Sequence, residues 1–293
     1  MSLVINERIA CFDGEMLKCS HSSQVVACDM AVNVYLPSGV APAVSSVPVL
    51  MFLSGLTCTP DNCSEKGFFQ CRASQRKIAM AYPDTSPRGL NVPGEDDEID
   101  LGTGASCYVD ATREPWNKGY RMYTYLTEEL PAVLSKGLPQ LDPTRLSLTG
   151  MCVGGHGAMM LYLKNPGKYR SCSAFAPVAN PSCSPWGRKA FAHFFGEEAK
   201  DKWKEHDSTE LVKSWKGSLD LLIDLGSEDH FDRQGQLLLD TFAAAVKATG
   251  VEGKIRIRKH AGHTHSYYFM STFAHEHVDY AADALLSQQK SLL

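Results

Sequence analysis

The sequence lacks the features that mark several classes of protein. Its formal net charge is −4, so there is no basic excess that would favour binding to nucleic acid or to an anionic membrane. It has no run of about 18 apolar residues, so we expect no membrane span. The first ten residues mix Asn6, Glu7 and Arg8 with apolar residues, which is not the layout of a secretion signal. We therefore expect a cytoplasmic protein.

The ten cysteines show no CxxC pair and no spacing typical of a zinc finger. Without a secretion signal, we interpret most of them as buried free thiols in a reducing compartment. His263 and His265 lie two positions apart, but no further cluster supplies the third and fourth ligands that zinc needs. We expect no metal site.

The composition is that of an ordinary globular protein, with 44% apolar and 21% charged residues among 293. Short apolar runs alternate with longer helical patterns, which predicts an α/β fold with a mostly parallel central sheet flanked by helices. No linker or repeat is present, so we expect a single domain over residues 1–293. The predicted strands are Val49–Leu53, Ile78–Tyr82, Leu146–Thr149, Ser173–Ala176, Leu219–Leu225 and Lys254–Arg258.

Helical patterns are predicted for Tyr120–Lys136 with a kink at Pro131, and for Gly155–Leu163, Gln236–Thr249 and Ser266–Gln288. Residues 5–36 are typical of antiparallel edge strands, and residues 180–216 are expected to cap the sheet. Residues 83–118 form a long irregular stretch rich in Gly, Asp and Pro. A stretch of this kind inside a compact domain is usually functional.

The strongest local pattern is Gly150-Met-Cys-Val-Gly154, between a predicted strand and a predicted helix. Gly-x-nucleophile-x-Gly places a side chain on a strained turn, with small residues on both sides. The helix that follows offers N–H groups and a dipole that favour a thiolate at Cys152. The same pattern would also suit a small buried thiol at a glycine-rich turn.

Longer strings spread along the chain resemble the S-formylglutathione hydrolase family, also called esterase D. The strings are Leu53-Ser-Gly-Leu-Thr-Cys-Thr59, Gly89-Leu-Asn-Val-Pro-Gly-Glu-Asp-Asp97, Gly102-Thr-Gly-Ala105, Tyr108-Val-Asp-Ala-Thr112, Tyr120-Arg-Met-Tyr-Thr-Tyr125, Lys164-Asn-Pro-Gly-Lys-Tyr169, Ser173-Ala-Phe-Ala-Pro177 and His265-Ser-Tyr-Tyr-Phe269. The resemblance covers nearly the whole chain and implies the α/β-hydrolase fold.

The chain departs from the family pattern around the nucleophile. The family usually has Gly-His-Ser-Met-Gly, whereas this chain has Cys152 between Met151 and Val153. Ile99 and Leu101 replace a usual Trp and Phe, and Ser106-Cys107-Tyr108 replaces Gly-Phe-Tyr. The scaffold therefore matches the family, while the nucleophile and part of the neighbouring loop do not.

The resemblance also implies which residues act as acid and base. In this fold the nucleophile, acid and base follow one another along the chain. The family pattern puts the acid at Asp229, with the neighbouring Glu228 as the alternative. Without a catalytic role, the carboxylate would serve to cap the helix that follows. Three histidines, His260, His263 and His265, follow the last predicted strand, and the resemblance selects His265 as the base.

An oxyanion hole needs two N–H donors that point to the developing negative oxygen. One is expected from Val153, the residue after the nucleophile, and the resemblance assigns the other to Leu56. Cys58 is predicted to lie near the site or, equally, to be a buried space-filler. Trp186 and Ile99 are candidates to narrow the acyl pocket, although Trp186 would also suit the core.

The resemblance implies hydrolysis of S-formylglutathione to formate and glutathione, with general carboxylesterase activity and without a cofactor. It implies a small-molecule substrate, the glutathione thioester, and a homodimer. With a cysteine as the nucleophile, the site could belong to a slow hydrolase, to a protein that stops at the acyl-enzyme, or to a competent thiol hydrolase. The alternatives are a thiol hydrolase resembling dienelactone hydrolase, transfer of the acyl group to another acceptor, and a protein that binds glutathione thioesters without turnover.

Overall fold

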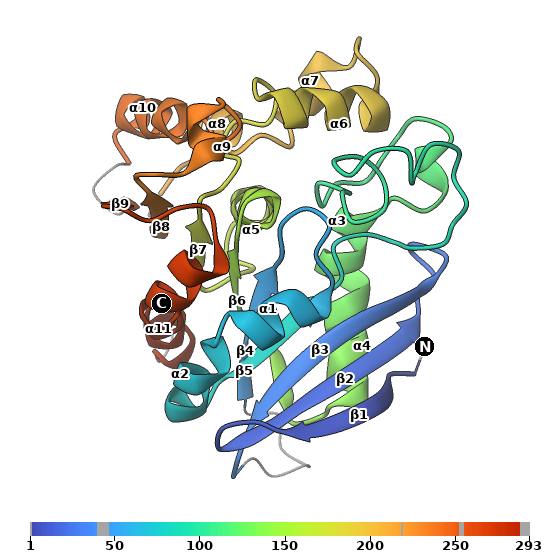
Figure 1. Cartoon of the computed structure of the whole chain (residues 1–293), viewed down its shortest axis with the longest axis vertical. Coiled ribbons are helices and arrows are strands. Elements are labelled where there is room, and N and C mark those ends of the chain that lie inside the picture. Colours follow the sequence, from blue (N-terminus) through green and yellow to red (C-terminus); the bar gives the residue numbers. More distant parts are fainter. Residues whose placement is uncertain (1, 40–46, 218, 252–254, 288–293) are drawn as a thin grey trace.

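The computed structural model describes residues 2–39, 47–217, 219–251 and 255–287. Within them, nine strands form one sheet in the order β1-β2-β3-β5-β4-β6-β7-β8-β9 (Figure 1). The strands from β5 to β9 in this order are parallel, and β1, β2 and β3 add an antiparallel edge. The bounds are β1 Val4–Ala10, β2 Gly14–Ser22, β3 Asp29–Pro37, β4 Val47–Leu53, β5 Ala79–Pro83, β6 Leu141–Gly150, β7 Cys172–Phe175, β8 Leu221–Gly226 and β9 Ile255–His260.

Helices cover the two faces of this sheet. Helix α5 (Val153–Lys164) packs on β4, β6 and β7, and α11 (Tyr267–Leu286) packs on the same strands and against α2. The other helices are α1 Pro60–Lys66, α2 Phe69–Arg76, η1 Trp116–Lys118, α3 Met122–Thr124, η2 Tyr125–Glu129, α4 Leu130–Gly137, α6 Pro185–Phe195, α7 Lys200–Lys204, α8 Ser208–Lys213, α9 His230–Arg233 and α10 Leu239–Thr249. The predicted mostly parallel sheet flanked by helices is confirmed.

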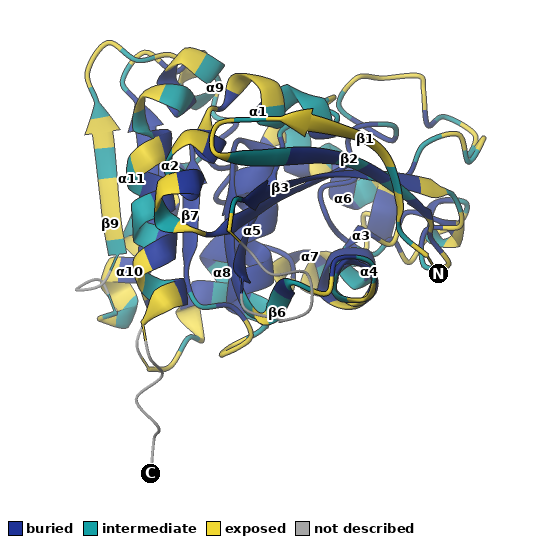
Figure 2. Ribbon diagram, turned by 90° about the horizontal axis from the view of Figure 1, so that it is seen from below, coloured by how far each residue is buried: buried dark blue, intermediate teal, exposed yellow. Residues whose placement is uncertain are grey.

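Burial follows this layering (Figure 2). Strands β4 and β5 are buried along their whole length, because both faces of the sheet are covered there. Strand β1, at the edge of the sheet, exposes most of its side chains. In the part of the chain that the structure describes, no helix is both long and apolar enough to cross a bilayer.

Several predicted elements differ in detail from the observed ones. The helix predicted over Tyr120–Lys136 is divided, because residues 125–129 form a π-helical turn before α4, and Pro131 lies in the first turn of α4. The helical backbone continues through this turn, since the N–H of Leu130 donates to the carbonyl oxygen of Tyr125, and Pro131 removes one N–H donor at the next position. Helices α1 and α2 were not predicted. Lys254 and Gln288, at the ends of two predicted elements, lie outside the described residues.

The irregular stretch was predicted correctly. Between β5 and η1 it contains isolated bridges and turns but no helix or longer strand. The segment 180–216 forms α6, α7 and α8, and Figure 1 shows α6 and α7 at the top of the molecule, beyond the ends of the parallel strands. Both segments therefore lie at the end of the sheet where the carboxyl ends of β4, β6, β8 and β9 meet.

Candidate active site

Cys152 lies in a sharp turn between β6, which ends at Gly150, and α5, which begins at Val153. Its backbone angles are φ 60° and ψ −122°. A residue with a side chain adopts this region only under strain, at a cost on the order of 1–3 kcal/mol. Gly154 is required nearby, because a Cβ there would lie 2.0 Å from the carbonyl oxygen of Leu53. The turn that the Gly-x-Cys-x-Gly pattern predicts is therefore present.

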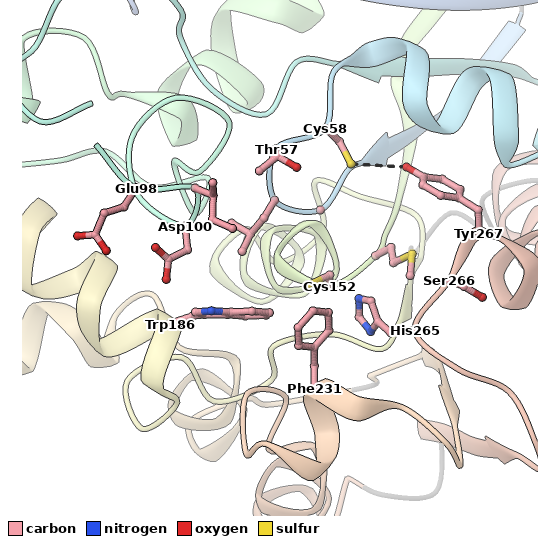
Figure 3. Close-up of a pocket in the computed structure, with 14 residues that line it drawn as sticks. Thr57, Cys58, Glu98, Asp100, Cys152, Trp186, Phe231, His265, Ser266 and Tyr267 are labelled. Atoms are coloured by element: carbon pink, nitrogen blue, oxygen red, sulfur yellow. Dashed lines mark hydrogen bonds between the residues drawn. The ribbon is translucent and has the colours of Figure 1, made fainter. Parts of the chain in front are cut away.

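His265 and Asp229 form a hydrogen-bonded pair beside this turn. Nδ1 of His265 lies 2.6 Å from Oδ2 of Asp229, which is fully buried. Oδ1 of Asp229 accepts the N–H groups of Phe231 at 2.9 Å and Asp232 at 3.2 Å, at the start of α9. The carboxylate is thus fixed from both sides. Figure 3 shows the His265 ring facing Cys152.

The alternative acid and bases lie elsewhere. Glu228 is exposed and forms an ion pair with Arg233. Nε2 of His260 lies 3.1 Å from Oδ2 of Asp224, and the His263 ring packs against aromatic rings of α11. Of the three histidines, His265 lines the same cavity as Cys152, and His260 and His263 do not.

The surroundings of His265 favour its protonated form. Burial alone would lower the pKa of this imidazole. The hydrogen bonds to Asp229 and Cys152, together with the negative charges of those groups, outweigh burial and raise the pKa to about 10. The pKa of Asp229 is lowered, because hydrogen bonds from His265 and from the backbone of α9 outweigh its desolvation. The arrangement can hold an imidazolium on His265, between the carboxylate of Asp229 and the side chain of Cys152.

Two backbone N–H groups near the turn have no recorded backbone acceptor within the described residues. Val153 is the first residue of α5, where a helix leaves its N–H unpaired. Within the described ranges, the backbone hydrogen bonds give no acceptor for the N–H of Leu56 or of Val153. The loop that carries Leu56 approaches closely, since a Cβ on Gly55 would lie 3.2 Å from Cβ of Cys152. The oxyanion hole at Leu56 and Val153 stays a prediction.

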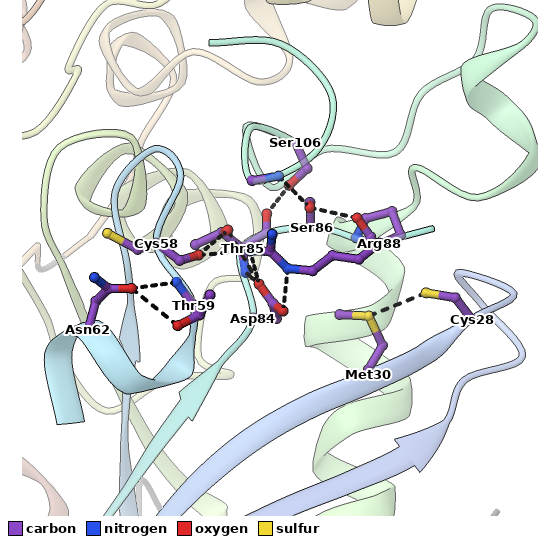
Figure 4. A network of polar contacts seen from close by, with 12 residues as sticks. Cys28, Met30, Cys58, Thr59, Asn62, Asp84, Thr85, Ser86, Arg88 and Ser106 are labelled. Atoms are coloured by element: carbon purple, nitrogen blue, oxygen red, sulfur yellow. Dashed lines mark hydrogen bonds and ion pairs between the residues drawn. The ribbon is translucent and has the colours of Figure 1, made fainter. Parts of the chain in front are cut away.

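The loop that carries Leu56 is held by polar contacts that sequence reasoning missed (Figure 4). The carbonyl oxygen of Cys58 accepts from Oγ1 of Thr85 at 2.7 Å and from Nη2 of Arg88 at 3.1 Å. Asp84, which is buried, forms a two-point ion pair with Arg88 at 2.8 Å. These bonds fix the loop at its far end.

The near end of the same loop is fixed by the irregular stretch. The Tyr108 hydroxyl donates to the carbonyl oxygen of Ser54 at 2.6 Å, and the N–H of Thr57 donates to Gly104 at 2.9 Å. Gly157 of α5 makes room for the Tyr108 ring, because a Cβ there would lie 2.6 Å from the ring. Tyr108 lies in one of the strings that resemble the family, and Arg88 lies directly before another. That position was the only sequence feature from which their role in the site could have been predicted.

Cys152 opens into a cavity of about 640 Å³ (Figure 3). The three predicted pocket residues, Cys58, Trp186 and Ile99, all line it. Phe231 and Tyr267 also line it and were not predicted as site residues. The complete lining is Gly55, Leu56, Thr57, Cys58, Glu98, Ile99, Asp100, Met151, Cys152, Trp186, Phe231, His265, Ser266 and Tyr267.

Cys58 differs chemically from Cys152. Its Sγ lies 3.6 Å from the hydroxyl of Tyr267. Burial raises the pKa of the Cys58 thiol, and the hydrogen bond to Tyr267 offsets only part of that effect. No histidine is recorded as its partner among the described residues. Cys58 is therefore a neutral thiol in the cavity wall rather than an activated nucleophile.

Metal ligands are not grouped in the described part of the chain. No three or more His, Cys, Asp or Glu side chains there are arranged to hold a metal ion.

Comparison with known proteins gives one consistent family. The model of a family described as a putative esterase matches residues 23–282. The S-formylglutathione hydrolase of Rattus norvegicus is 47% identical over 276 residues, covering 94% of this chain and 96% of the relative. That of Arabidopsis thaliana is 45% identical, covering 94% and 95%. A solved S-formylglutathione hydrolase from Agrobacterium tumefaciens superposes with a TM-score of 0.91 at 38% identity, covering 97% of this chain and 100% of that one.

Proposed function

The chain belongs to the esterase family that contains the S-formylglutathione hydrolases, and on that premise we propose that it hydrolyses S-formylglutathione to formate and glutathione. The observation that carries the proposal is the His265–Asp229 pair facing the thiol of Cys152 at the strained turn. The proposed catalytic residues are Cys152, His265 and Asp229. General carboxylesterase activity follows from the same chemistry.

Acylation starts from the ion pair in which the proton of Cys152 has passed to His265, the protonated form that the surroundings of His265 favour. Sγ then attacks the acyl carbon and forms a tetrahedral intermediate. Its negative oxygen accepts from the N–H groups of Leu56 and Val153. As the C–S bond to glutathione breaks, His265 returns its proton to the leaving thiolate. Asp229 stabilises the imidazolium that exists between these two transfers.

Deacylation needs His265 as a base toward water. In the acyl-enzyme, Sγ of Cys152 carries no negative charge, so the part of the raised His265 pKa that comes from Cys152 disappears. The neutral ring then accepts a proton from water, which attacks the thioester. Formate leaves and the thiol is restored, with Asp229 still fixing the ring through Nδ1.

The hydrolase is favoured over a dienelactone-hydrolase-like enzyme and over a binding protein without turnover. Relatives at 45–47% identity over nearly the whole chain are named S-formylglutathione hydrolase. A protein that only binds a thioester also has no need for an oriented base. We further infer a homodimer, on the family resemblance, and a cytoplasmic location. Size-exclusion chromatography with light scattering tests the first of these.

The decisive experiment compares the wild type with Cys152→Ser on S-formylglutathione and on p-nitrophenyl acetate. We expect the cysteine enzyme to acylate readily, show a burst and then turn over slowly, with an acyl adduct on Cys152 in intact-protein mass spectrometry. Sulfur forms longer bonds than oxygen, and a misplacement of the oxyanion on the order of 1 Å can cost ~10²-fold. Cys152→Ser should therefore raise steady turnover.

Cys152→Ala is the control and should show neither burst nor adduct. Steady turnover by the cysteine enzyme without a burst, and without a gain in Cys152→Ser, would mean that the site suits a thiol. Absence of any adduct or turnover in both forms would refute the hydrolase.

A further inference from the structure

One side of the cavity carries an apolar surface that the chemistry at Cys152 does not use. Ile99, Trp186 and Phe231, here called the acyl wall, line the cavity together with Cys152. The Trp186 and Phe231 rings lie 4.6 Å apart between centroids, and Phe231 meets His265 edge-on at 4.8 Å. Phe231 therefore separates Trp186 from the base.

Ile99 is held in an exposed position. It is 80% exposed, which is unusual for a large apolar side chain. Its two neighbours in the chain, Glu98 and Asp100, both form ion pairs with Lys189 of α6, and the distance to Asp100 is 2.6 Å. Trp186 belongs to the same helix, one turn earlier. Helix α6 thus carries one part of the acyl wall and anchors the segment that carries another.

The direction of the reaction decides which part of a substrate meets this wall. The leaving sulfur must lie within hydrogen-bond reach of His265, which has to protonate it. The oxyanion points to the N–H groups of Leu56 and Val153. The remaining substituent of the acyl carbon therefore points away from His265. Figure 3 shows Glu98, Asp100 and Trp186 on that side of Cys152, with His265 and Tyr267 on the other.

A formyl group has only a hydrogen atom as this substituent, so the acyl wall would remain in contact with water. We propose that the acyl wall is a subsite for apolar acyl groups of several carbons, with Ile99 as a specificity-determining residue. The inference rests on the proposed function and extends its substrates to thioesters and esters of medium-chain alkanoic acids. Each buried methylene strengthens binding about fourfold, on the basis of ~0.8 kcal/mol per methylene.

The test measures acylation of Cys152 by quenched intact-protein mass spectrometry. The probes are S-formyl-, S-acetyl-, S-butanoyl- and S-hexanoylglutathione, and a second series has the same acyl groups on p-nitrophenol. Each second-order rate constant is divided by that of the same compound with a free small thiol, which removes intrinsic reactivity. We expect the normalised constant to rise at least tenfold from acetyl to hexanoyl in both series.

Two matched variants locate the effect. Ile99→Asn should lower the hexanoyl-to-acetyl ratio about fourfold or more. Ile9→Asn, at an exposed isoleucine of the edge strand β1, should leave the ratio unchanged. Both replace an exposed isoleucine by the same polar residue.

Three outcomes would overturn the proposal, and they can be told apart. A normalised constant that falls from acetyl to hexanoyl, with formyl still acylating Cys152, refutes the subsite and leaves the proposed hydrolase intact. An Ile99→Asn effect that is equal for all acyl groups on glutathione, and absent on p-nitrophenol, would assign the wall to glutathione. Failure of every probe to acylate Cys152, with no hydrolysis by Cys152→Ser, refutes the proposed function itself.

Discussion

Two aspartate–histidine clusters lie five residues apart on the same strand and the loop after it, and they behave differently. Asp224, inside β8, is fully buried and accepts hydrogen bonds from Nε and Nη2 of Arg258, each at 2.7 Å. Nε2 of His277, on α11, lies 3.2 Å from Oδ2 of Asp224. Asp229, just after β8, accepts hydrogen bonds from His265 and from two backbone N–H groups. Among the described residues, no Arg or Lys forms an ion pair with it.

Burial, the guanidinium of Arg258 and the neighbouring Cys152 together explain the difference. Arg258 already neutralises Asp224, so burial dominates at His277 and lowers its pKa. Asp229 has no such cation, and its charge helps to raise the pKa of His265 to about 10. His265 also lines the cavity, whereas His277 is inaccessible and stacks on Phe175. We therefore expect an aspartate–histidine contact to serve catalysis only where no fixed cation competes and the ring reaches a substrate.

Asp229→Asn should produce the largest effect. We expect the rate of Cys152 acylation to fall ~10³–10⁴-fold, because an amide neither stabilises the imidazolium nor holds the correct tautomer. Stability should fall as well, since asparagine still caps α9 but loses the ion pair with His265. Burst kinetics with an activated ester measure the rate. A loss below tenfold would contradict the role of Asp229.

Asp224→Asn is the matched substitution in the other cluster. It removes the charge that Arg258 faces inside the fold, and we expect the free energy of unfolding to fall by about 3 kcal/mol. Acylation by the protein that remains folded should stay within a few-fold of the wild type. Urea denaturation gives the stability. A large loss of activity at unchanged stability would show that the two clusters act as one.

The two histidines should give stability opposite dependences on pH. The raised pKa of His265 contributes stability that is fully present below pH 6.5, its ordinary pKa, and is lost as the pH rises through about 10. The lowered pKa of His277 costs stability as the pH falls below its ordinary value.

Unfolding of His265→Gln and His277→Gln between pH 5 and 10 separates the two contributions. Cys152→Ala should weaken the His265 effect, because the hydrogen bond and charge of Cys152 help to raise that pKa. Parallel pH profiles in the two glutamine variants would remove the distinction between the clusters.

His260→Asn should produce the smallest effect. Nε2 of His260 lies near Asp224, but Arg258 already satisfies both carboxylate oxygens. We expect a loss of about 0.5–1 kcal/mol in stability and an unchanged acylation rate. A rate loss above a hundredfold would make His260, rather than His265, the base.

The sequence predicted the parts of the site that depend on neighbours along the chain. The turn at Cys152 follows from Gly150 and Gly154, because only small residues let strand and helix approach so closely. The apolar runs located all six predicted strands of the parallel part within a few residues. The π-helical turn before α4 was missed, since hydrophobic periodicity does not distinguish a π-helical turn from the α-helix around it.

Contacts between distant segments could not be derived in the same way. The three histidines after the last strand have similar local surroundings, and only the packing of α11 and β8 places His260 against Asp224 and His265 against Asp229. Tyr108 reaches Ser54 across 54 positions of the chain. No periodicity records such a contact, because loop conformation sets it.

The sequence by itself therefore determined the fold class, the family and the strained turn at Cys152, since these depend on hydrophobic pattern and on the size of adjacent residues. Only the tertiary structure decided which aspartate acquires an arginine, which histidine reaches the cavity and which apolar side chains surround the thiol. The free energy of a buried charge depends on the groups within a few ångströms of it, and the fold brings those groups from separate parts of the chain.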